Sequence, residues 1–213
     1  MTDLIKEGFV YIAQPPLFRI RKNKSELYLK DEKELDNYFI QEMVENSVLK
    51  LKNGDVLKGD PLQDLFSNLS EFISLLDEMS TKNENYKLLL EQATVANFFN
   101  KSNFQNKQKT QETIDYTLKR LNFIDKQWNA DISSNDNFKF IREENKVKET
   151  FEIKKHDIEN NLFERLDGFS ETIQEFFLSP SKLSFKDEEL KIVTPRDLVN
   201  LSFELSKKGI TVQ

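Results

Sequence analysis

The sequence has no cysteine, one histidine, one tryptophan and only five glycines in 213 residues. The absence of cysteine excludes disulfides, thiolate metal sites and cysteine nucleophiles, and it is compatible with a reducing cytosol. The single histidine, His156, excludes a site built from several histidines, and we expect it at a helix start or on the surface. So few glycines leave no glycine-rich loop of the kind that cradles phosphates.

Long apolar runs and paired metal-binding carboxylates are also missing. No stretch approaches the roughly 20 residues that a helix needs to span a bilayer, and residues 1–8 resemble neither a signal peptide nor a transit peptide. We therefore expect a soluble, cytoplasmic protein with no membrane partner. There is no D-x-D motif, and Asp131 and Asp136 stand too far apart in a predicted loop for us to expect a metal there.

Positive charge is scarce outside the N-terminal part. The net charge is −6, but residues 1–30 sum to +3, so the remaining residues sum to −9. An acidic body argues against broad coating of nucleic acid, and any DNA contact should lie in the basic N-terminal patch. Arg19 and Arg21 point the same way on a predicted strand, with Lys22 and Lys24 at the adjoining turn. These four residues could hold phosphates without reading bases, although an ordinary solvated hairpin has the same pattern.

The periodicity predicts an α+β fold, with helices packed on small antiparallel sheets. The apolar run at 9–13 is typical of a strand buried on both faces, and we expect it to share a sheet with the strand at 210–213. Trp128 and the phenylalanine stripes at helical spacing indicate core packing rather than base stacking. The predicted strands are 17–21, 26–29, 48–51, 56–58, one near Trp128, 138–141, 147–153, 183–185, 190–192 and 210–213. The predicted helices begin at Asp31, at an N-cap Asp60, and at the capped Thr194, and others span 83–99, 110–124 and 157–178.

Two segments carry a resemblance to a known family. Residues 11–18, YIAQPPLF, are similar to the YIAQPPLY stretch of the DNA gyrase B family, and the match continues through 19–24 and 28–31. Residues 197–213 resemble the helix and strand that lead into the family's RYKGLGE motif. Glu91-Gln92-Ala93 and the segment 195–198 are closest to alphaproteobacterial forms.

The resemblance implies how the chain is organised. Residues 1–40 would be part of the metal-binding TOPRIM domain, 41–193 an insertion found in gyrase B of many Gram-negative bacteria, and 194–213 the returning helix and strand. Both ends would then be cut from a larger protein. We expect the insertion to brace gyrase B against neighbouring domains and to influence DNA binding without taking part in the chemistry.

The resemblance also implies a function, that of an ATP-dependent type II topoisomerase that negatively supercoils DNA by double-strand passage. Mg²⁺ and ATP would be cofactors of the full-length protein, with none held by this fragment and no catalytic or metal-binding residue in it. The implied partners are double-stranded DNA and DNA gyrase A, in an A2B2 heterotetramer. The alternative, from the residues alone, is a stand-alone helical interaction module that shares only a short motif by chance.

Overall fold

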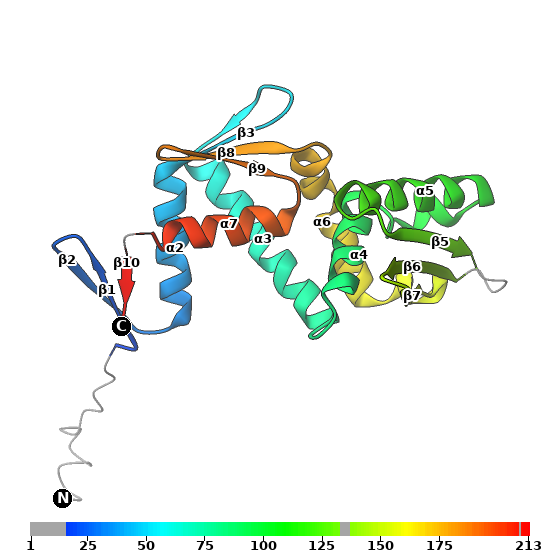
Figure 1. Ribbon diagram of the computed structural model, residues 1–213, viewed down its shortest axis with the longest axis horizontal. Helices are drawn as coiled ribbons and strands as arrows, with labels where there is room; N and C mark the ends of the chain where they lie inside the picture. The colour runs from blue at the N-terminus through cyan, green and yellow to red at the C-terminus, as the bar shows by residue number, and fades with distance from the viewer. Residues whose placement is uncertain (1–15, 133–136, 209) are drawn as a thin grey trace, which may run out of the picture.

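The computed structural model describes residues 16–132, 137–208 and 210–213, which form helices packed on three antiparallel sheets (Figure 1). The α+β fold class is therefore confirmed. The helices are α2 (Glu32–Asn46), α3 (Asp60–Met79), α4 (Glu84–Val95), α5 (Lys107–Ile124), α6 (Asn161–Phe177) and α7 (Pro195–Ser206), with 3-10 turns η1 (Lys101–Phe104) and η2 (Lys155–Glu159). The strands are β1 (Phe18–Lys22), β2 (Ser25–Leu29), β3 (Ser47–Lys50), β4 (Val56–Leu57), β5 (Trp128–Ile132), β6 (Phe138–Glu144), β7 (Val147–Ile153), β8 (Ser181–Phe185), β9 (Glu188–Ile192) and β10 (Ile210–Val212).

The first sheet joins the two ends of the described chain. Its order is β10-β1-β2, and β1 is antiparallel to both neighbours. The predicted hairpin is confirmed, with its turn at Asn23 in the left-handed region (φ 55°), which asparagine tolerates better than most residues. The strand expected at 9–13 lies outside the described residues, so its predicted place beside 210–213 stays a prediction.

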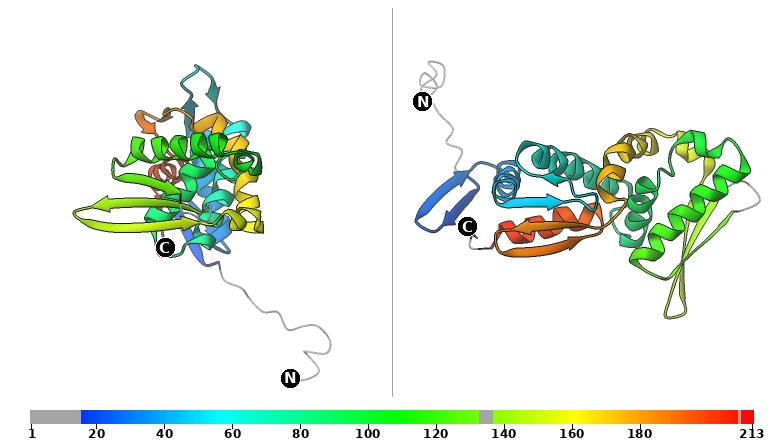
Figure 2. Two further views of the ribbon diagram at one scale, coloured as in Figure 1. Left: turned by 90° about the vertical axis from the view of Figure 1, so that its right-hand side faces the viewer. Right: turned by 90° about the horizontal axis from the view of Figure 1, so that it is seen from above.

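The rest of the chain forms two lobes that share one hydrophobic core (Figure 2). In what we call the proximal lobe, the sheet β4-β3-β8-β9 lies against α2, α3 and α7. In the distal lobe, the sheet β5-β6-β7 lies against α4, α5 and α6. The hairpin of β1 and β2 projects from the proximal lobe at the end farthest from the distal lobe.

Several helix boundaries differ from the sequence prediction because capping residues override the apolar stripe. Asp60 was predicted as an N-cap but is the first residue of α3, since Gly59 takes the cap position with φ 61° and ψ −138°, a conformation that suits glycine. Helix α4 ends at Val95 instead of 99, because Asn97 turns left-handed at φ 58°. Helix α6 begins at Asn161, and the residues predicted for its first turn form η2 instead. The Asn106 side chain accepts a bond from the Lys109 amide and starts α5 before the predicted 110.

Phenylalanine supplies much of the core, as the stripes predicted. Phe98 is fully buried and its ring packs edge-on against those of Phe99, Phe104 and Phe138, with centroids 5.3–5.4 Å apart. Trp128 is only 3% exposed, so core packing rather than base stacking is confirmed for it. Among the helices of the described residues, none is long and apolar enough to cross a membrane.

Candidate nucleic-acid interface

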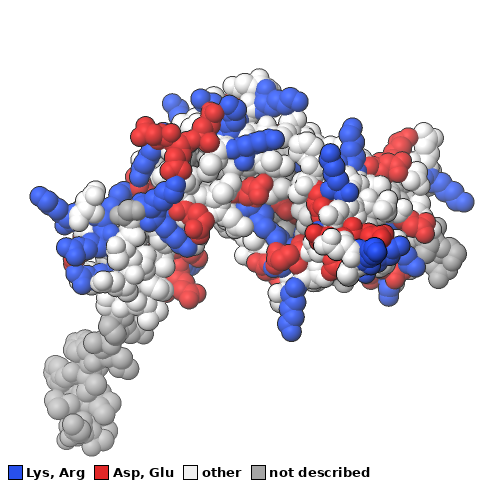
Figure 3. All heavy atoms as spheres, viewed as in Figure 1, with Lys and Arg blue, Asp and Glu red and all other residues white. Residues whose placement is uncertain are grey.

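The hairpin of β1 and β2 presents its two arginines on one face. Ile20 lies between them on the opposite face and is 1% exposed, because alternate residues of a strand face opposite ways. The Arg19 side chain is 40% exposed and that of Arg21 is 64% exposed, so both guanidinium groups reach solvent. Lysine and arginine side chains crowd around this end of the molecule in the space-filling view (Figure 3).

Glu26 on β2 lies between the two arginines. Arg19 Nη2 donates to Glu26 Oε1 over 2.5 Å, and Arg21 Nε lies 3.8 Å from the same oxygen. Glu26 and Arg21 are direct cross-strand partners, which places the carboxylate within reach of both guanidinium groups. The hydrogen bond from Arg19 lowers the pKa of Glu26, so its carboxylate is ionised at neutral pH. This face therefore carries two positive charges and one negative charge.

Lys22 belongs to a different contact. It lies on the face opposite the arginines, where its Nζ donates to Glu42 Oε2 of α2 over 2.5 Å. The Glu42 side chain is 7% exposed, and this hydrogen bond raises the pKa of Lys22. Lys22 thus fastens the hairpin to α2, which leaves its charge largely matched. Lys24 stands in the exposed turn.

The four predicted residues are thus only partly brought together. The structure groups Arg19 with Arg21, separates Lys22 from them, and adds a lysine that the sequence did not indicate. Lys186, in the turn between β8 and β9, lies 3.9 Å from Glu42 Oε1, so Glu42 has lysines from two distant segments beside it. The one signal for Glu42 was its place one turn after Phe39 and beside Met43, on the buried side of a predicted helix.

The described residues offer no metal centre. No group of three or more histidines, aspartates and glutamates among residues 16–132, 137–208 and 210–213 is arranged to hold an ion. His156 is exposed in η2, where its Nε2 lies 3.1 Å from Asp157 Oδ1. Asp131 lies on β5, and Asp136 falls outside the described residues.

Comparison with known proteins finds similarity over the whole chain. The curated DNA gyrase B protein of Rickettsia prowazekii is 33% identical over 216 residues that include all of this chain. Over its whole length the chain is similar to DNA gyrase B. The gyrase B of Caulobacter vibrioides is 27% identical, again over the complete chain. Both organisms are alphaproteobacteria, the group that the sequence resemblance indicated.

The chain spans about a quarter of these gyrase B relatives, 26% of the length of each. A type 2 topoisomerase B protein of Aquifex aeolicus is 39% identical over 72 residues, which cover 34% of this chain and 9% of that protein. No protein-family model matches the chain. Because the similarity to gyrase B covers every part of the chain, a short motif shared by chance does not account for it.

Proposed function

We propose that this chain is a segment of DNA gyrase B, part of the ATP-dependent type II topoisomerase that negatively supercoils DNA by double-strand passage. The observation that carries the proposal is the similarity to gyrase B over the complete chain, in more than one alphaproteobacterium. The partners that follow are double-stranded DNA and DNA gyrase A, in an A2B2 heterotetramer. As a segment of gyrase B, the chain would act in the cytoplasm.

Within that enzyme, the segment would act as support and as a contact for the DNA backbone. Arg19 and Arg21 are exposed side by side on a three-stranded sheet, an arrangement that suits phosphates. Among the residues that the structure describes, neither arginine is held by a buried carboxylate, and the exposed Glu26 is the carboxylate that a phosphate has to displace. Lys24 at the turn would add a third cation, whereas Lys22 would chiefly hold the hairpin in place through Glu42.

The division into residues 1–40, 41–193 and 194–213 is part of the same proposal. Helices α2 and α7 pack against one another through Phe39 and Phe203, whose ring centroids are 5.1 Å apart although they come from opposite ends of the chain. That contact supports a flanking unit made from both ends. The Aquifex type 2 topoisomerase B protein is similar over only 34% of this chain, in keeping with a segment of which part varies among relatives.

Magnesium and ATP would belong to other parts of the full-length protein. The residues described here do not fit a magnesium site, because no three carboxylates come together among them. In the full enzyme the ion would stabilise charge at the scissile phosphate, while this segment's arginines would hold the backbone nearby.

The test is the double substitution Arg19→Ala and Arg21→Ala in full-length gyrase B, in complex with gyrase A. We expect DNA affinity to fall and the slope of log affinity against log salt to become shallower by about 1–2, since each phosphate contact contributes roughly 0.9. Fluorescence anisotropy with a labelled duplex at several salt concentrations measures both quantities.

A matched control removes the same charge elsewhere. Lys107 and Lys109 are exposed at the start of α5 in the distal lobe, and the change of both to alanine should leave the salt slope as it is. Equal losses in the two double variants would mean that only net charge matters. Unchanged affinity and slope in the arginine variant would overturn the DNA contact.

A further inference from the structure

Three lysines lie side by side across the sheet β4-β3-β8-β9. Lys50 is the cross-strand partner of Lys182, and Lys182 is the cross-strand partner of Lys191, so the three form one row over β3, β8 and β9. All three are exposed, whereas their neighbours Leu49 and Leu183 are buried, because alternate residues of a strand face opposite ways. We call these three residues the lysine row. Adjacent strands lie roughly 4.8 Å apart, so the lysine row spans about 10 Å.

Acidic side chains offset only part of this charge. Glu189 lies on the same side of the sheet, and its Oε2 accepts a hydrogen bond of 2.9 Å from Lys182. That bond lowers the pKa of Glu189, so the carboxylate is ionised at neutral pH. Lys50 and Lys191 have no ion-pair partner among the residues that the structure describes. Three positive charges and one negative charge therefore leave a surplus of two cations here, in a chain whose net charge is −6.

The register of the lysine row has a cost for the isolated chain. Like charges directly opposite one another destabilise an antiparallel pair, and the row contains two such pairs next to each other. Glu189 is bonded to the central lysine, so the two outer ones keep their full charge. An anion that extends across the row would relieve the repulsion over its whole width.

The residues beside the lysine row indicate which anion fits. On the same side of the strands lie Val48, Val56 and Ser184, with no aromatic ring among them. Sites for single-stranded nucleic acid stack bases on aromatic side chains, and protein interfaces bury an apolar centre, so this surface suits neither. Ammonium groups hold phosphates without reading bases. At a rise of about 3.4 Å per nucleotide, the row covers roughly three nucleotides of one strand of a duplex.

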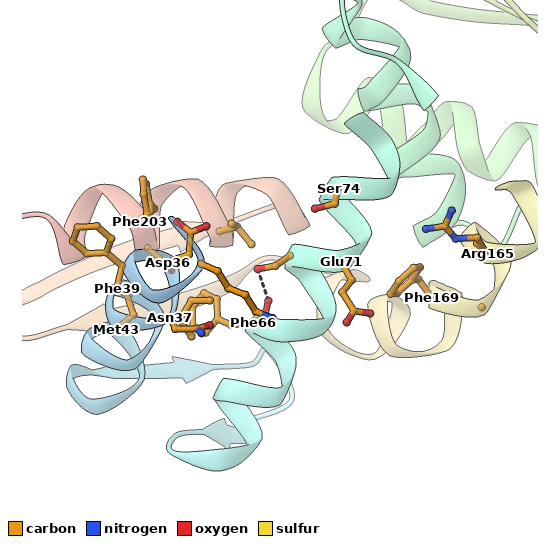
Figure 4. Close-up of a pocket in the computed structure, with 16 residues that line it drawn as sticks. Asp36, Asn37, Phe39, Met43, Phe66, Glu71, Ser74, Arg165, Phe169 and Phe203 are labelled. Atoms are coloured by element: carbon orange, nitrogen blue, oxygen red, sulfur yellow. Dashed lines mark hydrogen bonds between the residues drawn. The ribbon is translucent and has the colours of Figure 1, made fainter. Parts of the chain in front are cut away.

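The packing beneath the sheet keeps the lysine row in place. Leu49, Leu183 and Ile192 face inward and are each 0% exposed. The cavity among α2, α3, α6 and α7 is lined by residues of these helices alone, so it does not undercut the strands (Figure 4). Lysine and arginine side chains gather over this sheet in the space-filling view (Figure 3).

We propose that the lysine row holds the backbone of double-stranded DNA, as a second contact besides Arg19 and Arg21. The two contacts lie on different sheets, since the arginines belong to β10-β1-β2. The inference rests on the proposed function, which supplies a DNA duplex as the partner. It adds a DNA contact in the middle of the chain, where the net charge alone argues against one.

The test is Lys50→Gln with Lys182→Gln and Lys191→Gln in full-length gyrase B, assembled with gyrase A. Glutamine keeps a long polar side chain and removes the charge. We expect the slope of log affinity against log salt to become shallower by about 2, because each phosphate contact contributes roughly 0.9, and the affinity to fall about tenfold. Anisotropy titrations with a labelled duplex at several salt concentrations measure both. Arginine at the same three positions keeps the charge and should keep both quantities.

A matched control removes three exposed lysines from another surface. Lys107→Gln with Lys109→Gln and Lys119→Gln changes α5 of the distal lobe by the same charge and should leave the slope as it is. Equal losses in the two triple variants would overturn the proposal, because net charge would then explain both. An unchanged slope in the lysine-row variant would overturn it too. So would weaker assembly with gyrase A in the absence of DNA, which would assign the row to a protein partner.

The arginine variants separate this inference from the proposed DNA contact. For two independent contacts, the losses of slope in the arginine and lysine-row variants should add when the changes are combined. A loss in the arginine variant alone would overturn the role of the lysine row and leave that of Arg19 and Arg21. A loss in the lysine-row variant alone would support the lysine row and overturn the arginine contact. The lysine-row variant should unfold at the same urea concentration as wild type or a higher one, because the substitutions remove repulsion.

Discussion

The carboxylate of Glu91 is the least exposed acidic group of the described residues and joins the two lobes. It is 1% exposed on α4, and its Oε1 accepts a hydrogen bond of 2.9 Å from the backbone amide of Arg196 in the first turn of α7. The amides at a helix start favour negative charge, so the contact suits an anion. The guanidinium group of Arg196 also reaches Glu84 on α4, at 2.5 Å. One residue of α7 therefore holds two acids of α4.

Burial makes Glu91 sensitive to pH. It raises the pKa of Glu91 from 4.5 to about 7, and Asp197 adds to the rise, while the Arg196 amide and the charges of Arg196 and Arg120 oppose it. Because the folded state binds the proton more tightly, this group's stabilising contribution is complete below pH 4.5 and is lost as pH rises through 7.

The variant Glu91→Gln should remove that dependence. Glutamine keeps an acceptor for the Arg196 amide without the cost of a buried charge, so at about pH 8 we expect the variant to be more stable by about 1–3 kcal/mol. At about pH 5 the difference should shrink towards zero. Urea unfolding at both values measures it. The exposed Glu84→Gln serves as control, and parallel pH profiles of wild type and Glu91→Gln would contradict the prediction.

The carboxylate of Glu26 gives a second prediction, one that depends on the proposed DNA contact. Glu26 competes with phosphate for Arg19 and Arg21, so Glu26→Gln should increase DNA affinity by several-fold and steepen the salt slope by up to about 0.9. Anisotropy titrations on the assembled enzyme measure both. A fall in affinity would mean that Glu26 serves to position the arginines and does not compete with DNA.

Helices and strands were predictable where the cap and the apolar pattern agree. Asp31 accepts from the Glu34 amide at 2.8 Å, and Thr194 with Asp197 forms a reciprocal capping box, as their spacing indicated. The prediction of Asp60 as the N-cap of α3 is wrong, because Gly59 before it takes the cap position in a backbone conformation that aspartate avoids. The pairing of β3 with β8 could not be predicted, because it joins segments far apart in the sequence through backbone bonds.

The candidate site shows the same limit. The alternation of Arg19 and Arg21 predicted their shared face, since strand period alone fixes it. The role of Lys22 could not be predicted, because its partner Glu42 comes from a helix 20 residues away. Lys186 could not be placed either, since only the fold brings the turn of β8 and β9 to the end of α2.

Helix α6 contains a glycine whose replacement should stabilise it. A Cβ at Gly168 meets nothing within 4 Å. Gly168→Ala should therefore raise the free energy of unfolding by about 0.5–1 kcal/mol, because alanine lowers the conformational entropy of the unfolded chain and favours the helix more than glycine does. The contrasting change is Gly59→Ala, which forces a Cβ onto φ 61° and should destabilise by about 1 kcal/mol or more. Chemical denaturation compares the two, and effects of the same sign would contradict the argument.

At the scale of the whole molecule, the segment between α2 and β9 begins and ends at neighbouring positions in space. Ser47 of β3 and Phe185 of β8 are cross-strand partners, and the Lys186 amide donates to the Asn46 carbonyl over 3.2 Å. Two antiparallel positions at this distance can be joined by a two-residue turn. The geometry therefore permits removal of residues 48–184 without stretching α2 away from α7.

That deletion tests whether the middle of the chain braces the proposed enzyme. In full-length gyrase B with gyrase A, we expect weaker DNA binding and slower supercoiling, because the hairpin rests on α2 and α2 would lose its support from α3. ATP hydrolysis without DNA should persist, since the ATP site would lie in another part of the protein. Gel assays of supercoiling, anisotropy and a phosphate-release assay follow the three activities.

Intact supercoiling and DNA affinity would show that the middle has no bracing role. Loss of ATP hydrolysis as well would point to general misfolding of the deletion variant. Circular dichroism would detect such misfolding directly. The milder Gly59→Ala variant, which keeps the whole chain, would show whether weakening the middle alone reduces DNA binding and supercoiling.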